Sequence, residues 1–133
     1  MSPSYPEPVG DQEALTRFLL EKKKFAASTG RVKYRAFLPP PASQAISVYR
    51  VDDLDQEDLW SLGQEYVAIP TGKPLLARGD VPAALVFAQG LQIDSTETPH
   101  PRHANIRNFP ADATKVRLIA IVLADASKLH VAP

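Results

Sequence analysis

Prolines divide this chain of 133 residues into short segments and restrict its fold more than any other feature. A proline lacks the backbone N–H and fixes φ, so it is excluded from helix interiors and central strands. The 13 prolines predict an extended arm over residues 1–10, before a single domain over residues 11–133. A triplet at 39–41 ends one segment, and further prolines predict a connector at 69–82 and an irregular segment at 94–112. A long irregular segment in a small domain is usually functional or mobile.

Between the prolines, apolar residues recur with helical or strand periods. The apolar stripe of Leu15, Phe18 and Leu19 predicts a helix, and the alternation around Val32 and Tyr34 predicts a strand. The complete prediction has helices at 12–25, 55–67 and 113–128 and strands at 32–38, 46–51 and 90–94. Residues 83–88 and 115–124 fit either a helix or a strand by period. The predicted fold class is α+β, with two or three helices packed on a small mixed or antiparallel sheet.

The absence of cysteine removes several classes of site at once. Disulfides, thiolate zinc sites and cysteine nucleophiles are all excluded. The first residues lack the basic start and apolar run of a secretory signal. No apolar stretch reaches the roughly 18 residues that a membrane-spanning helix needs. We therefore expect a cytoplasmic protein with no membrane partner.

The charges balance in total but not along the chain. There are 15 basic and 15 acidic residues, so the formal net charge is zero. Eight basic residues lie between Arg17 and Arg50 against one acid, whereas six acids and no base lie between Asp52 and Glu65. A dedicated nucleic-acid domain is usually basic overall, so the balance argues against that class. Whether the two charged stretches separate in space depends on the fold.

The segment 98–110 carries the residues with the most chemical potential. His100 and His103 can exchange protons near neutral pH, and Arg102 or Arg107 can hold a phosphate. With Asn105 to position a substrate, these residues would serve phosphodiester cleavage or phosphate recognition. Alternatively, the histidines bond backbone carbonyls and hold the loop as a scaffold. Two histidines are too few ligands for a metal, so we predict neither a metal nor a cofactor.

A second candidate is a basic set that can contact a phosphate backbone, with Tyr34 and Phe25 beside it to stack on bases. The alternative is a solvated helix end and the outer face of a strand. The candidate phosphate-binding residues of the basic set are Lys22, Lys23, Lys24, Arg31, Lys33 and Arg35.

The string His-Pro-Arg-His-Ala-Asn-Ile at 100–106, with Ser-Val-Tyr-Arg at 47–50 and Asp-Leu-Trp-Ser-Leu-Gly at 58–63, resembles a family of small bacterial proteins without an established function. The resemblance spans roughly residues 31–129. It implies a bacterial cytosolic protein, from a mobile-element or defence neighbourhood. It implies no catalytic residue.

The leading hypothesis is a binding or accessory protein that acts through a macromolecular partner. The chain has no complete catalytic motif, and its charges balance. The alternative is a phosphate-directed nucleic-acid binder or small nuclease that uses the loop from His100 to Asn105. That alternative requires the basic set and the histidine loop to share one face.

Overall fold

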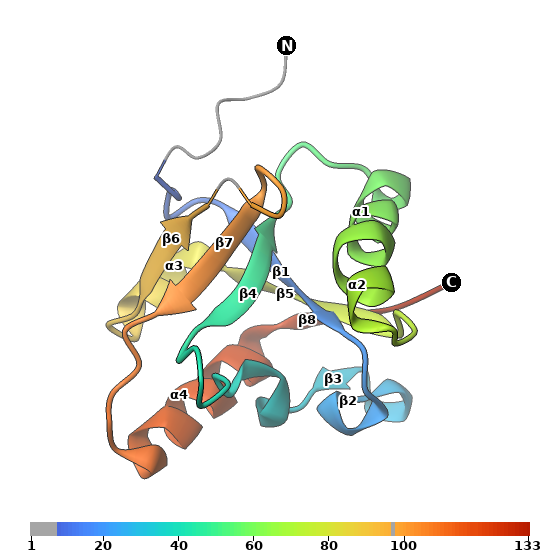
Figure 1. The fold of residues 1–133 in the computed structure, drawn as a ribbon. Coiled ribbons are helices and arrows are strands. Elements are labelled where there is room, and N and C mark those ends of the chain that lie inside the picture. The colour runs from blue at the N-terminus through green and yellow to red at the C-terminus, as the bar shows by residue number, and fades with distance from the viewer. Residues whose placement is uncertain (1–7, 97) are drawn as a thin grey trace.

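The computed structural model describes residues 8–96 and 98–133, so most of the predicted arm lies outside the described residues. The chain forms a six-stranded antiparallel sheet in the order β6-β7-β4-β1-β5-β8 (Figure 1). Its strands are β1 (Ala14–Leu19), β4 (Ile46–Arg50), β5 (Ala77–Pro82), β6 (Gln92–Ser95), β7 (His103–Arg107) and β8 (Lys128–Val131). This architecture confirms the predicted α+β class.

The helices and short turns complete the fold. The α-helices are α1 (Gln56–Gly63), α2 (Ile69–Thr71), α3 (Ala83–Ala88) and α4 (Ala113–Ala126). A small second sheet consists of β2 (Phe25–Ala26) and β3 (Arg31–Val32). The 3-10 turns are η1 (Lys22–Lys24), η2 (Ala27–Thr29) and η3 (Tyr34–Phe37), and the π-helical turn η4 (Gln64–Ala68) continues α1.

Several predicted elements are confirmed. The helix predicted at 55–67 is α1 with η4, and the helix predicted at 113–128 is α4. Both begin with an aspartate cap, because Asp55 accepts a hydrogen bond from the Asp58 amide and Asp112 accepts two from the first turn of α4. The strands predicted at 46–51 and 90–94 correspond to β4 and β6, and residues 83–88 are helical.

The helix predicted at 12–25 is wrong, because residues 14–19 form the central strand β1. This strand pairs with β4 on one side and β5 on the other. Both of its faces are covered, with Leu15 and Leu19 in the larger core and Phe18 in a second core under α1. A strand that is buried on both faces loses the alternation of apolar and polar residues, so its pattern imitated a helix.

The strand predicted at 32–38 is wrong beyond Val32. Residues 34–37 form η3, which buries Ala36 and Phe37, two consecutive residues, against the core. Consecutive buried residues are incompatible with a strand that buries one face. The turn η3 packs on α4 instead.

Besides β1, three strands of the six-stranded sheet lie where no strand was predicted. The predicted connector at 69–82 contains β5, the irregular segment at 94–112 contains β7, and β8 follows α4. Strand β5 includes Arg78, Gly79 and Asp80, which have low strand propensity, but it hydrogen-bonds to β1 and β8. Gly79 is required there because a Cβ would lie 2.9 Å from a methyl group of Val32.

The two faces of the sheet differ in how they are covered. The larger core lies on the face that packs against α3, α4 and η3. The opposite face carries α1 over a smaller cluster of Phe18, Tyr49, Leu59 and Leu62. In Figure 1, α1 stands to one side, and the surface of β4, β7 and β6 beside it is not covered by any helix. Polar side chains occupy that surface.

Candidate functional site

His103 lies in β7 on the face of the sheet that carries α1. Its ring is buried, with 7% of the residue exposed, and it stands edge-on to Tyr49 at a centroid distance of 5.2 Å. The ring is held at both nitrogens. Nδ1 lies 2.7 Å from Oγ1 of Thr96, and Nε2 lies 3.1 Å from Oγ of Ser47. The histidine therefore bonds two hydroxyl groups, in place of the backbone carbonyls of the scaffold interpretation.

The surroundings of Thr96 favour one tautomer of His103. The Thr96 hydroxyl has a single proton, and its two other neighbours are the carbonyl oxygens of Thr98 at 2.9 Å and His103 at 3.1 Å. A carbonyl only accepts, so the hydroxyl proton is directed to a carbonyl and Nδ1–H donates to Oγ1. This leaves the lone pair of Nε2 facing the Ser47 hydroxyl.

His100 has different neighbours. Its Nδ1 accepts a hydrogen bond of 3.1 Å from the Arg102 amide, and its ring stands edge-on to Tyr66 at 4.8 Å. Burial lowers the pKa of His100, and the nearby charge of Arg102 lowers it further. Burial also lowers the pKa of His103. Among the described residues, the two rings have no common hydrogen-bond partner.

The predicted phosphate clamps are both engaged within the chain. Nη1 of Arg102 donates to the carbonyl oxygens of Arg50 at 3.0 Å and Asp52 at 2.9 Å. Nε of Arg107 forms an ion pair of 2.5 Å with Asp94. Asn105, the predicted positioning residue, lies between these groups on β7 and is partly exposed. Its side chain makes no hydrogen bond within the described part of the chain.

Part of the predicted basic set is neutralised by acids. Lys23 and Lys24 form ion pairs with Glu21, and Arg31 forms one of 3.0 Å with Asp125. Burial lowers the pKa of Lys24, and the nearby charge of Arg17 lowers it further.

The remaining cations gather around η3 and α4. Lys22, Lys33 and Arg35 are exposed and have no acidic partner among residues 8–96 and 98–133. Sequence reasoning missed two exposed cations on α4, Lys115 and Arg117. The guanidinium carbon of Arg117 lies 4.9 Å from the centre of the Tyr34 ring. We call the exposed group the basic end; it consists of Lys22, Lys33, Arg35, Lys115 and Arg117.

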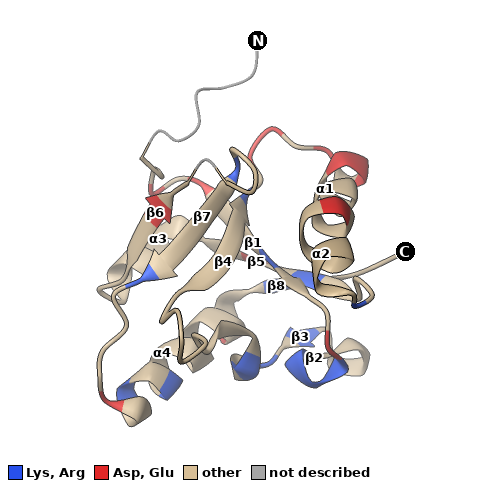
Figure 2. Cartoon of the chain, viewed as in Figure 1, with Lys and Arg blue, Asp and Glu red and all other residues tan. Residues whose placement is uncertain are grey.

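Charge is partly separated in space. Figure 2 shows most of the basic residues around β2, β3 and α4, with a few acidic residues among them at the start of α4 and between β1 and β2, and further acidic residues at the start of α1, before β1 and on β6. The histidine loop before β7 lies at the acidic end, opposite the β2–β3 sheet (Figure 1). The structure therefore does not bring the basic set and the histidine loop to one face.

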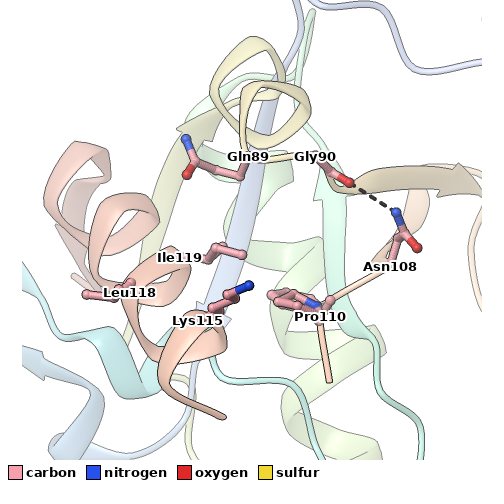
Figure 3. A pocket seen from close by; sticks show the side chains of 8 residues that line it. Gln89, Gly90, Asn108, Pro110, Lys115, Leu118 and Ile119 are labelled. Atoms are coloured by element: carbon pink, nitrogen blue, oxygen red, sulfur yellow. Dashed lines mark hydrogen bonds between the residues drawn. The ribbon is translucent and has the colours of Figure 1, made fainter. Parts of the chain in front are cut away.

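Two hollows adjoin the basic end. A groove of about 680 Å³ runs between η3 and α4, with Tyr34, Leu38, Pro41, Val116 and Arg117 among its walls. A second hollow of about 580 Å³ lies on the other side of Pro110. Figure 3 shows Lys115 and Ile119 of α4 facing Pro110 across it, and Asn108 donating a hydrogen bond of 3.1 Å to the Gly90 carbonyl.

The free energy of unfolding is expected to fall as pH drops from 7 through about 6.5, the ordinary histidine pKa. Burial holds the pKa of His103 below that of the unfolded chain, so acid protonates the unfolded state first. Each such proton contributes a slope of at most about 1.4 kcal/mol per pH unit. Urea unfolding at several pH values measures it. His103→Gln is expected to have a shallower slope, and an unchanged slope would contradict the assignment.

Within the described ranges, no group of three or more His, Asp or Glu side chains is placed to hold a metal ion. The described helices are also too short or too polar to cross a membrane. Comparisons with protein-family models, curated proteins and solved structures found no significant match to this chain.

Proposed function

We propose that this chain is a binding protein that acts through a macromolecular partner, and that the partner is a single-stranded nucleic acid held by the basic end. The supporting observation is the separation of charge. The net charge of zero conceals a basic end whose five cations have no acidic partner in the described structure. Most of the acids in the described structure lie away from these cations, at the start of α1, before β1 and on β6 (Figure 2), whereas Glu21, Asp112 and Asp125 lie among the basic residues.

The charges near a bound phosphate backbone affect its binding more than the net charge of the protein does, because salt screens the distant charges. At physiological salt, interactions between exposed charges are largely screened beyond about 8 Å. A phosphate backbone along η3 and α4 therefore meets Lys33, Arg35 and Arg117 with little repulsion from the acids around α1. Neutralising phosphates with such cations releases counterions, which supplies most of the affinity in sequence-independent binding.

The groove beside these cations favours an unpaired base over a duplex. Its walls combine apolar side chains with the aromatic ring of Tyr34. The guanidinium groups of Arg35 and Arg117 lie within 5.8 Å and 4.9 Å of the centre of that ring. Flat groups of this kind stack on exposed bases, and such stacking tolerates any base sequence. The paired bases of a duplex are stacked on each other and do not enter such a groove.

Cleavage is not part of this proposal. The histidines that the nuclease hypothesis requires lie at the acidic end, away from the cations that would hold the substrate. The resemblance to small bacterial proteins, with the mobile-element or defence setting that it implies, stays a prediction, and the proposal does not depend on it.

Fluorescence anisotropy with short labelled single-stranded RNA and DNA tests the proposal, with duplexes for comparison. We expect salt-sensitive binding that is tighter for single strands. Arg117→Glu is expected to weaken it by roughly 10-fold or more and to reduce the salt slope by about 0.7 for each phosphate that the variant no longer neutralises.

The matched control is Arg107→Glu, which makes the same charge change at an exposed arginine that is paired with Asp94 on the sheet. This variant is expected to bind nearly as well as the unmodified protein. Equal weakening by both substitutions would contradict a site at the basic end. Absence of binding to every strand would direct the search to a protein partner.

A further inference from the structure

A serine, a histidine and an asparagine lie together on the uncovered surface of β4 and β7, on the opposite face of the sheet from α4 and η3. We propose that they form a nucleophilic site in which Ser47 attacks the carbonyl group of small esters and His103 is the general base. This inference goes beyond the proposed binding function and does not depend on it.

The position of Ser47 suits a nucleophile. The residue is exposed in the middle of β4, between the buried residues Ile46 and Val48. Its hydroxyl has one protein partner in the described structure, Nε2 of His103 at 3.1 Å. Its backbone is fixed, because Nη1 of Arg17 donates a hydrogen bond of 3.0 Å to the Ser47 carbonyl. An accessible hydroxyl on a rigid strand, bonded to a histidine, is the basic arrangement of an activated serine.

His103 is prepared to accept the proton. Its Nδ1–H is directed to Thr96, which leaves Nε2 as the acceptor for the Ser47 hydroxyl. Burial beside Tyr49 favours the neutral ring, the form that a general base requires at neutral pH. Thr96 takes the place of the carboxylate in a serine–histidine–aspartate triad as a positioning residue, because it fixes the tautomer and the orientation of the ring.

Asn105 completes the site. It is the direct partner of Ser47 across the β4–β7 ladder. Side chains of such pairs have Cβ atoms about 4.5–5.5 Å apart on the same face of the sheet. The Asn105 amide is partly exposed and makes no hydrogen bond among the described residues, so it is available to a ligand. A side-chain amide beside a nucleophile can stabilise the oxyanion of a tetrahedral intermediate.

The reaction balances without any further reagent except water. The Ser47 oxygen forms a bond to the carbonyl carbon while its proton moves to Nε2 of His103. The tetrahedral intermediate expels the alcohol, which takes that proton. Water then attacks the acyl-serine, His103 receives a proton from the water and returns it to the Ser47 oxygen, and the acid leaves. The net reaction is hydrolysis of the ester.

The openness of the surface defines the substrate class. No described helix covers Ser47, and neighbouring exposed side chains on this face are polar, such as Arg107 and Gln92. Such a face admits water and offers no apolar pocket for a long acyl chain. The expected substrates are therefore unhindered esters with a short acyl group and a good leaving group.

A fluorophosphonate probe tests Ser47 directly, because the serine oxygen bonds to phosphorus and fluoride leaves, while His103 takes the proton. We expect mass spectrometry of the labelled protein to locate the adduct on Ser47. Ser47→Ala is expected to abolish both labelling and the hydrolysis of p-nitrophenyl acetate. Ser43→Ala removes another exposed serine, which has no histidine partner, and is expected to change neither.

His103→Gln is expected to slow labelling roughly 100-fold, the usual contribution of a general base. Because His103 is buried, its variant is compared with Thr96→Val, which removes the hydroxyl at Nδ1, and with Thr96→Ser, which restores it. We expect slower labelling in Thr96→Val and recovery in Thr96→Ser. Two results would overturn the proposal. One is an adduct on other serines only, and the other is labelling of Ser47 in His103→Gln and Thr96→Val at the same rate as in Thr96→Ser.

Discussion

Arg78→Met is expected to lower the free energy of unfolding by about 3–5 kcal/mol, the cost of removing one partner from a buried ion pair. The Arg78 side chain is fully buried in β5, and Nη1 lies 2.7 Å from both carboxylate oxygens of Asp80. Its Nη2 donates to Gln56 at 2.6 Å, and its guanidinium lies 5.1 Å from the centre of the Trp60 ring. Without the arginine, the carboxylate of Asp80, whose side chain is 23% exposed, keeps His130 as a neighbour at 3.3 Å but loses its closest cation.

Urea unfolding followed by circular dichroism measures this loss, and two further variants separate its causes. Arg31→Met removes the cation of an exposed pair, with side-chain exposures of 65% and 56%, and is expected to cost less than about 1 kcal/mol. The double variant Arg78→Met/Asp80→Leu leaves neither charge unpaired and is expected to recover most of the stability. If the single and double variants were equally unstable, lost packing would explain the effect better than an unpaired charge.

The fold class could be predicted because helix caps and the spacing of apolar residues can be recognised in the sequence. The clearest examples are α1 and α4, each with an aspartate cap and an apolar face. Strand β1 could not be predicted, because Leu15, Phe18 and Leu19 lie at positions i, i+3 and i+4 and fit a helix equally well. What decides the structure of this segment is that β4 and β5 pair with both of its edges. Such pairing is a tertiary effect that no local pattern contains.

One missed strand did carry a local signal. In β7, the polar residues His103, Asn105 and Arg107 alternate with the buried residues Ala104 and Ile106. Alternation of this kind is typical of a strand with one buried face. The prolines before and after β7 outweighed it, although Pro101 and Pro110 both lie outside the strand and so remove none of its hydrogen bonds.

The candidate sites depend on contacts that are distant in sequence. The histidine segment could be singled out by composition, but the partner of His103 is Ser47, 56 residues away, which β4 places beside β7. In the same way, α4 brings Arg117 to Tyr34. Residue types therefore singled out His103 as a candidate, and only the strand register and the helix packing identified Ser47 beside it and Arg117 beside Tyr34.

Phe37→Ala is expected to cost about 3–5 kcal/mol, the usual loss for truncating a fully buried phenylalanine. Phe37 has 0% exposure and lies in the larger core at the end of η3. Its removal leaves a cavity at the contact between η3 and α4, the two elements that carry most of the basic end. Thermal or urea unfolding measures the loss.

The matched control is Phe87→Ala in α3, where 37% of the residue is exposed, so a much smaller loss is expected. Phe37→Leu keeps most of the apolar volume and should retain most of the stability. Because η3 positions Tyr34 and Arg35, Phe37→Ala is also expected to weaken binding of single-stranded nucleic acid at a temperature where it remains folded, with no change in charge. Unchanged affinity in a folded Phe37→Ala protein would mean that the groove between η3 and α4 does not take part in binding.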